Sequence, residues 1–212
     1  PRPDRRGGHA IYRDVCFARV DGFRSLLLDL RVPEGGDGAS AGGHLALLAA
    51  LTAGHPDLEG NVGVPDRSSA VAACASWFGP TEFLTMTEQA PPGAPGHEAA
   101  GSPESRLIGA PLRSAPGLAA AASPISYVSA SAPPILLVHG TVDRVVPYAQ
   151  SVSLAERLEA VGAVVTLLPV ADGDHGFAGG DAGAAARATM EFFDRELSAP
   201  APAAGASQSR RP

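Results

Sequence analysis

The sequence contains no lysine: all 16 basic residues are arginine, and the formal net charge is −6. A Walker-type phosphate loop, a Schiff-base enzyme and a Ser-x-x-Lys acylase each require a lysine, so these three classes are excluded. The arginines form no basic stripe and the charge balance is acidic, which argues against nucleic-acid binding. We therefore expect no nucleic-acid partner.

Cysteines are scarce and long apolar runs are absent. Cys16 and Cys74 lie far apart among strand-like apolar residues. We therefore expect buried free thiols, and neither a disulfide framework nor a metal site. No stretch approaches the roughly 18 consecutive apolar residues of a membrane-spanning helix, so no span is expected. The chain begins with Pro1 and shows no signal peptide, so we expect an upstream start or an incomplete sequence, and a cytoplasmic location.

What is present suits one folded domain. The chain has 212 residues, of which 45% are hydrophobic, so a sizeable core is possible. Its 25 glycines and 20 prolines gather near 91–117 and after 198, which indicates loops. We expect a disordered lead over 1–11, a folded domain over 12–197 and a disordered tail over 198–212.

The first part of the chain predicts an antiparallel hairpin followed by a helix. Apolar residues alternate or run together over 12–20 and 23–32, with the turn-forming Asp21-Gly22 between them. Residues 42–53 are rich in Gly, Ala and Leu. They predict a helix that is apolar nearly all round and therefore buried.

The rest of the chain alternates between strands and helices. Short apolar runs predict buried strands and longer segments predict helices: strands at 70–76, 134–138 and 164–170, and helices at 147–161 and 181–197. This alternation predicts an α/β fold with a mostly parallel sheet flanked by helices. The Pro- and Gly-rich excursion over 80–124, with short helices near 104–109 and 117–122, is expected over the surface or along an active-site edge.

The segment Gly38-Ala39-Ser40-Ala41-Gly42 matches G-x-S-x-G. In this motif a nucleophilic serine sits on a strained turn between a strand and a helix, and the residues two positions away must be small. Ser40 is therefore the candidate nucleophile, and the N–H of Ala41 is the candidate oxyanion donor. By itself the pentapeptide also suits a Gly-rich loop that caps a helix.

Two further segments supply an acid and a base. Asp143 follows the predicted strand at 134–138, where a carboxylate can hold an imidazole in the required tautomer. His175 follows the next strand and lies between small residues, so it is the candidate general base. Taken singly, Asp143 suits a turn and His175 an exposed loop. A metal site from Asp172, Asp174 and His175 has too few ligands with defined spacing.

The order Ser40, Asp143, His175 is the order of an α/β-hydrolase triad. At these residues the chain resembles α/β-hydrolase-fold esterases of the lipase/esterase group, which includes hormone-sensitive-lipase-like and feruloyl-esterase-like (BD-FAE) enzymes. The resemblance covers about 12–197. It is carried by GASAGGHLA (38–46), WFGPTEF (77–83), SPESRLIGAP (102–111), ASPISYVS (122–129), PPILLVHGTVDRVVPYAQS (133–151) and GDHGF (173–177).

The resemblance implies an enzyme that hydrolyses carboxylic esters, short-chain or aryl, through Ser40, Asp143 and His175. It implies a small-molecule ester as partner and no metal or organic cofactor. A prolyl-oligopeptidase-like peptidase shares the architecture, but SAGGH and WFGPTEF look more like the esterases. The sequence does not indicate an oligomeric state.

One part of the family pattern is missing. Such enzymes carry a His-Gly-Gly oxyanion loop before the elbow, and this chain has none. Only four residues separate Pro33 from Gly38, where three strands and two helices, roughly 60–70 residues, are normally found. We expect central strands to be missing, the elbow strand among them, unless 26–32 replaces it. The alternative to an esterase is therefore a catalytically impaired remnant or a binding-only domain.

Overall fold

A four-stranded parallel sheet forms the centre of the computed structural model, which describes residues 4–6, 9–18, 26–33, 36–59 and 68–198. The strand order is β4-β5-β6-β7, with all neighbours parallel. The strands are β4 (Gly36–Ala39), β5 (Cys74–Trp77), β6 (Ile135–Gly140) and β7 (Val165–Val170). The α/β fold class predicted from the sequence is confirmed.

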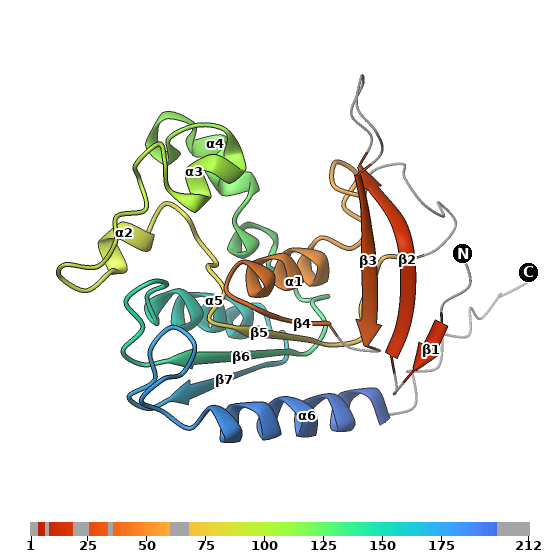
Figure 1. Ribbon diagram of the computed structural model, residues 1–212. Helices are drawn as coiled ribbons and strands as arrows, with labels where there is room; N and C mark the ends of the chain where they lie inside the picture. The colour runs from red at the N-terminus through yellow and green to blue at the C-terminus, as the bar shows by residue number, and fades with distance from the viewer. Residues whose placement is uncertain (1–3, 7–8, 19–25, 34–35, 60–67, 199–212) are drawn as a thin grey trace, which may run out of the picture.

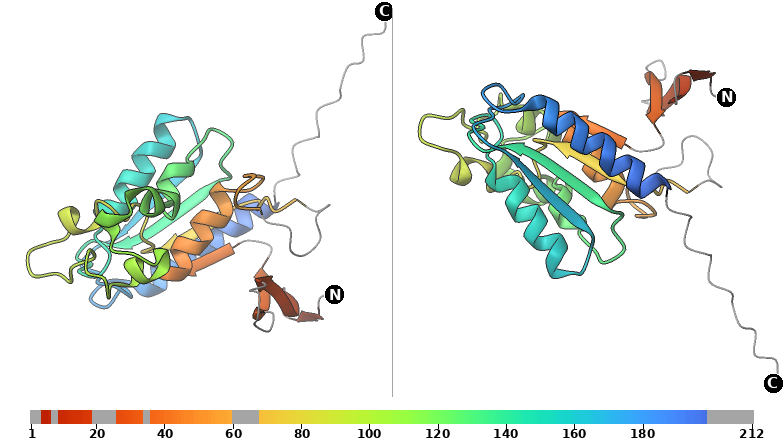
Figure 2. Two further views of the ribbon diagram at one scale, coloured as in Figure 1. Left: turned by 90° about the horizontal axis from the view of Figure 1, so that it is seen from above. Right: turned by 90° about the horizontal axis from the view of Figure 1, so that it is seen from below.

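Helices cover both faces of this sheet (Figures 1 and 2). α1 (Ala41–Leu51) and α5 (Ala149–Ala160) lie on one face, and α6 (Ala182–Ser198) crosses the other. In β6, Ile135 and Leu137 pack with the α1 and α5 cluster, whereas Leu136 and Val138 pack with the α6 cluster. Successive residues of a strand point to opposite faces, so a continuous apolar run is what a strand covered on both sides requires.

The excursion after β5 forms a separate group of short helices on the same side of the sheet as α1 and α5 (Figure 1). It contains α2 (Met86–Gln89), α3 (Pro103–Ile108), η1 (Leu112–Ser114), α4 (Pro116–Ala121) and η2 (Pro124–Tyr127). The fully buried side chain of Gln150 in α5 connects this group to the rest of the domain by hydrogen bonds. Its amide oxygen accepts from the backbone N–H groups of Thr81 and Glu82, at 2.8 and 2.7 Å, and its amide nitrogen donates to Gln89 at 2.6 Å.

The N-terminal strands form their own antiparallel sheet in the order β1-β2-β3. Its strands are β1 (Asp4–Arg6), β2 (His9–Ala18) and β3 (Leu26–Pro33). The antiparallel pairing of β2 with β3 agrees with the predicted hairpin, although Asp21-Gly22 lies outside the described residues. β1 and the start of β2 fall within the lead that the sequence predicts to be disordered. The structure differs there because strand pairing uses backbone groups, which a polar segment also offers.

The strand before Ser40 is a correction to the sequence-based expectation. Gly36–Ala39 forms β4, which pairs with β5 from Gly36 opposite Cys74 to Ala39 opposite Trp77. The segment 26–32 does not replace it, since that segment belongs to β3 of the other sheet. The sequence pattern fails here because tertiary pairing with an apolar neighbour overrides the poor strand propensity of Gly and Asp.

α1 is the second correction. The sequence predicts burial nearly all round, but only one side is covered: Leu47 is fully buried and Leu45 is 60% exposed. β4 ends the strand order, and within the described ranges no strand pairs with its outer side. α1 therefore packs on the margin of the sheet.

Three smaller expectations complete the comparison. Cys74 is buried in β5 as predicted, whereas the side chain of Cys16 lies outside the described part of the chain. The predicted tail falls almost wholly on 199–212, which the structure does not describe. Across the described ranges, no helix is long and apolar enough to cross a bilayer.

Candidate active site

Ser40 lies on the turn between β4 and α1 with φ 53° and ψ −120°. A non-glycine residue with positive φ is uncommon and strained, and such residues gather at functional sites. The turn is anchored by the backbone, because the N–H of Ser40 donates to the carbonyl of Trp77 at 2.8 Å. This is the strand–turn–helix setting that the G-x-S-x-G motif requires.

The small residues around Ser40 do not all serve the same purpose. A Cβ on Gly38 would lie 2.2 Å from the carbonyl oxygen of Gly42, so no side chain fits there. A Cβ on Gly42 would meet nothing within 4 Å, whereas one on Gly43 would lie 2.7 Å from Ser76 Oγ. The steric requirement predicted for both motif glycines therefore holds at Gly38, but on the helix side it falls on Gly43.

Asp143 lies in the loop that follows β6, and its side chain is fully buried. Its Oδ1 accepts from the backbone N–H groups of Val145 and Val146 at 2.7 and 2.9 Å. Its Oδ2 faces His175 at 2.8 Å and His139 at 3.2 Å. Burial acts to raise the pKa of Asp143, but these hydrogen bonds outweigh it and hold the pKa well below its usual range. The carboxylate is therefore ionised at neutral pH.

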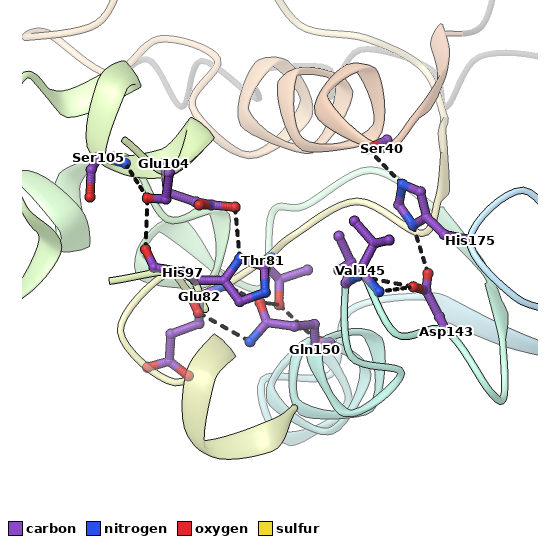
Figure 3. Close-up of polar contacts among 12 residues, drawn as sticks. Ser40, Thr81, Glu82, His97, Glu104, Ser105, Asp143, Val145, Gln150 and His175 are labelled. Carbon is purple, nitrogen blue, oxygen red and sulfur yellow. Dashed lines mark hydrogen bonds and ion pairs between the residues drawn. The ribbon is translucent and has the colours of Figure 1, made fainter. Parts of the chain in front are cut away.

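His175 follows β7 and joins the other two residues (Figure 3). Its Nδ1 lies 2.8 Å from Asp143 Oδ2, and its Nε2 lies 2.9 Å from Ser40 Oγ. Because an ionised carboxylate only accepts, Nδ1 carries the proton and Nε2 is free to accept from the serine hydroxyl. The structure thus brings together the three residues that the sequence singled out.

Two residues that the sequence analysis did not single out support the hydrogen-bonded series Ser40–His175–Asp143. Phe78 has φ 41°, is buried, and its ring lies 4.6 Å from that of His175 between centroids. His139 is fully buried behind Asp143, where Nε2 donates to the carbonyl of Val146 at 2.9 Å and Nδ1 accepts from Ser151 Oγ at 2.7 Å. Both lie within segments quoted for the resemblance, but neither residue type signals its role.

A pocket of about 320 Å³ opens beside the serine. Ser40 and Ala41 line one side, and the excursion after β5 supplies much of the rest. Ala41 is the first residue of α1, so its N–H has no acceptor within the helix and is available to a ligand. The wall residues are largely apolar: Pro80, Phe83, Pro95, Pro103, Leu107, Val145 and Val146.

Two of the three residues considered for a metal site make other contacts. Asp174 Oδ1 accepts from the N–H of Ala178 at 2.8 Å, and His175 is engaged by Asp143 and Ser40. Throughout the described ranges, no cluster of three or more His, Cys, Asp or Glu side chains is arranged to hold a metal ion.

Ser40 on its strained turn is hydrogen-bonded to His175, which is hydrogen-bonded in turn to Asp143, and all three follow the carboxyl ends of parallel strands. This is the arrangement found in serine hydrolases of the α/β-hydrolase fold. The BD-FAE family model matches residues 37–158, more than half of the chain, and the TAP-like protein family model matches residues 118–204. The chain belongs to the BD-FAE family of α/β-hydrolase esterases.

Individual relatives agree with this assignment. Esterase LipQ of Mycobacterium tuberculosis is 37% identical over 144 residues, which are 66% of this chain and 32% of LipQ. A solved truncated carbohydrate esterase from gut microbiota is 34% identical with a TM-score of 0.65, covering 76% of this chain and 59% of that one. The solved esterase Est2 of Thermogutta terrifontis is 27% identical with a TM-score of 0.54, covering 80% and 58%. The chain thus spans about a third of LipQ and under two thirds of these solved esterases.

Proposed function

We propose that this chain hydrolyses carboxylic esters through an acyl-enzyme, with Ser40 as nucleophile, His175 as general base and Asp143 as the acid that orients it. The observation that carries the proposal is the unbroken hydrogen-bond chain from Ser40 Oγ to His175 Nε2 at 2.9 Å, and from His175 Nδ1 to Asp143 at 2.8 Å. A hydroxyl is a weak nucleophile unless a positioned base removes its proton during attack.

The reaction proceeds in two halves. His175 Nε2 takes the proton of Ser40 as its Oγ attacks the acyl carbonyl, and the imidazolium is stabilised by the ionised Asp143. The imidazolium then gives that proton to the leaving alkoxide oxygen, and the ester bond breaks to leave the acyl group on Ser40. Water, deprotonated by the same nitrogen, releases the carboxylic acid and restores the serine.

Charge on the carbonyl oxygen needs hydrogen-bond donors. The N–H of Ala41 supplies one, at the positive end of α1. The His-Gly-Gly segment that would supply more is absent from the sequence. Since one such donor contributes roughly 10²- to 10³-fold in turnover, we expect catalysis well below that of a complete esterase.

Short-chain esters suit the pocket best. Its volume of about 320 Å³ and its apolar wall fit a small acyl or aryl group. The related Est2 was solved with propionate and with butyrate bound, which supports a short acyl chain here as well. Solved peptidases of this fold are 23% identical to the chain, a likeness that supports the fold alone and gives a peptidase no further support.

Turnover of p-nitrophenyl acetate and butyrate tests the proposal, with Ser40→Ala as the paired variant. We expect Ser40→Ala to lose at least about 10³-fold of the activity while circular dichroism shows its fold retained. A fluorophosphonate probe should add its mass to the wild-type chain and leave Ser40→Ala unmodified. Equal rates and equal labelling in the two proteins would refute the enzymatic proposal.

A catalytically impaired remnant is the second candidate. It is favoured by two facts: the chain covers only 59% of the solved carbohydrate esterase, and the elbow strand β4 lies at the edge of the described sheet. The labelling experiment separates the two. A remnant with a misplaced Ser40 neither turns over esters nor reacts with the probe, whereas an enzyme lacking one oxyanion donor does both slowly.

A further inference from the structure

His97 and Glu104 form a buried ionisable pair in the wall of the pocket that Ser40 lines. His97 comes from the loop before α3, and Glu104 is the second residue of α3. Their side chains are only 6% and 8% exposed, and His97 Nδ1 lies 3.1 Å from Glu104 Oε1 (Figure 3). Charged side chains are almost never buried to this degree unless they are paired.

Each member of the pair has one buried polar atom without a hydrogen-bond partner among the described residues. These two atoms are His97 Nε2 and Glu104 Oε2. Burial acts to raise the pKa of Glu104, but its hydrogen bonds, that from His97 above all, outweigh this effect and keep the pKa below its ordinary value. Glu104 is therefore ionised, Nδ1 of His97 donates to it, and Oε2 is an unused acceptor.

The hydroxyl of Ser102 also holds this loop, because it accepts from the N–H of Ser105 at 3.1 Å and donates to the carbonyl of His97 at 2.8 Å. The helix start is thus capped without His97 Nε2 or Glu104 Oε2. A buried polar atom without a partner destabilises the fold, so these two atoms call for a partner that enters the pocket.

His44, a third ionisable side chain of the wall, is already engaged. His44 stacks on Phe83 with ring centroids 5.0 Å apart and donates through Nε2 to the carbonyl of Ala122 at 2.7 Å. Burial lowers the pKa of His44, and the charge of Glu104 acts in the opposite direction, so the field of this carboxylate extends to a second wall residue. Apart from Ser40 and the engaged His44, Glu104 and His97 are therefore the polar side chains of a largely apolar pocket.

We propose that His97 and Glu104 form a specificity subsite that binds a hydroxyl group of the ester substrate. The inference rests on the proposed esterase function and extends it, since it names what the pocket selects. A hydroxyl donates to Glu104 Oε2, and a second hydroxyl, where present, pairs with His97 Nε2.

Other polar groups fit this pair less well. A substrate carboxylate meets the charge of Glu104 and is repelled. An ammonium group is attracted by the charge of Glu104, but it brings three donors to the pair and leaves at least one of them unpaired against the apolar wall. A plain alkyl group leaves both buried atoms unpaired, and sites built to hydrogen-bond a hydroxyl reject analogues that lack it.

The hydroxyl can reside on either side of the ester bond, and two substrate pairs separate these sources. p-Nitrophenyl 3-hydroxybutyrate against p-nitrophenyl butyrate tests the acyl side. Glyceryl monobutyrate against propyl butyrate tests the alcohol side. For one pair we expect the wild-type chain to favour the hydroxylated ester about tenfold in kcat/KM, equivalent to about 1.4 kcal/mol.

Variants assign this preference to the pair. Glu104→Gln keeps the shape and removes the charge, and His97→Phe keeps the bulk and removes the nitrogens. Both should bring the ratio of hydroxylated to plain ester close to one. Ser105→Ala is the matched control: Ser105 lies next to Glu104, is 2% exposed and has an equally unpartnered hydroxyl, but it does not line the pocket. It should keep the wild-type ratio.

A wild-type ratio near one for both substrate pairs would overturn the proposal, as would an unchanged ratio in Glu104→Gln. A binding measurement distinguishes failure of the subsite proposal from failure of the esterase proposal. Calorimetric titration of Ser40→Ala with 3-hydroxybutyryl and butyryl esters, and with the two alcohol-side esters, needs no turnover. We expect about tenfold tighter binding of one hydroxylated ester, and equal affinities would refute the subsite even in a chain without activity.

Discussion

The proposed acid–base half of the site and its proposed nucleophile half are supported by different amounts of structure. Asp143 follows β6, which has a strand on either side, and its two oxygens receive hydrogen bonds from backbone and side chains. Ser40 follows β4, a strand of four residues at the end of the strand order. The helix after it exposes Leu45, whereas the loops on the other half bury Asp143 and Phe177.

The two halves therefore depend on different elements of the described sheet. The acid and base positions depend on β6, β7 and the loops after them, all of which lie within the described chain. The nucleophile depends on its pairing with β5 and on close backbone packing at Gly38 and Gly43. We therefore expect substitutions on the acid–base half to impair chemistry without disturbing the fold, and substitutions around Ser40 to displace the nucleophile itself.

Asp143→Asn should have the largest effect. Its amide oxygen can still accept from Val145 and Val146, so the loop is kept, but the amide no longer fixes the tautomer of His175. Turnover of p-nitrophenyl butyrate should fall by about 10⁴-fold. Asp174→Asn is the control, because Asp174 serves only the adjacent turn through Ala178. A loss below about tenfold in Asp143→Asn would remove Asp143 from the proposed triad.

Gly38→Ala tests the nucleophile half. The added Cβ would lie 2.2 Å from the carbonyl oxygen of Gly42, so the elbow must shift. Because an error of about 1 Å in such a site can cost about 10²-fold, kcat/KM should fall by at least that factor. Gly42→Ala places its Cβ in open space within α1 and should keep the activity while gaining about 0.5–1 kcal/mol in urea unfolding. Similar losses in both variants would contradict the packing described here.

The strands and long helices after residue 70 were largely predictable because local signals mark them, although β5 begins at Cys74 and not at residue 70. The strand 135–140 begins with a continuous apolar run over 135–138, and Gly162 ends the helix before the next strand. The convergence of Ser40, Asp143 and His175 was predictable for the same reason: each follows a strand end, in the chain order of an α/β-hydrolase. These local signals agree with the global fold, which is the condition under which sequence reasoning succeeds.

β4, Phe78 and the His97–Glu104 pair were not predictable. Gly36–Ala39 has no strand propensity of its own and becomes a strand only because β5 pairs with it. His97 and Glu104 stand in a Pro- and Gly-rich stretch with no motif, and their pairing depends on a loop that no periodicity encodes. No periodic pattern of residues in the sequence marks tertiary contacts of this kind.

Acid unfolding should depend on Asp143. Its pKa is lower in the folded chain than the value of about 3.9 for an unfolded aspartate, so its stabilising contribution is present above that pH. The contribution is lost as the pH falls below that value towards the folded pKa, by at most about 1.4 kcal/mol per pH unit. Urea unfolding from pH 6 to pH 3 should therefore show the difference between wild type and Asp143→Asn shrinking with acid. A difference that is constant with pH would contradict this account.

Phe78→Leu should reduce activity modestly. The ring of Phe78 lies 4.6 Å from that of His175, and an aromatic contact of this kind is worth about 0.5–1.5 kcal/mol. We expect kcat to fall up to about tenfold with KM nearly unchanged, since Phe78 does not line the pocket. Phe193→Leu removes a ring from α6 without touching His175 and controls for lost packing. A change in KM alone would show that Phe78 acts on substrate binding instead.

Leu45→Gln should have the smallest effect on stability and tests whether the margin of the sheet is open in solution. Leu45 is 60% exposed on α1, so its replacement should change the unfolding free energy by less than about 0.5 kcal/mol and reduce self-association in sedimentation. Leu47→Gln on the buried side of the same helix should cost more than about 2 kcal/mol. If Leu45→Gln costs as much as Leu47→Gln, another segment or chain covers α1 beside Ser40. The nucleophile half would then be supported as fully as the acid–base half.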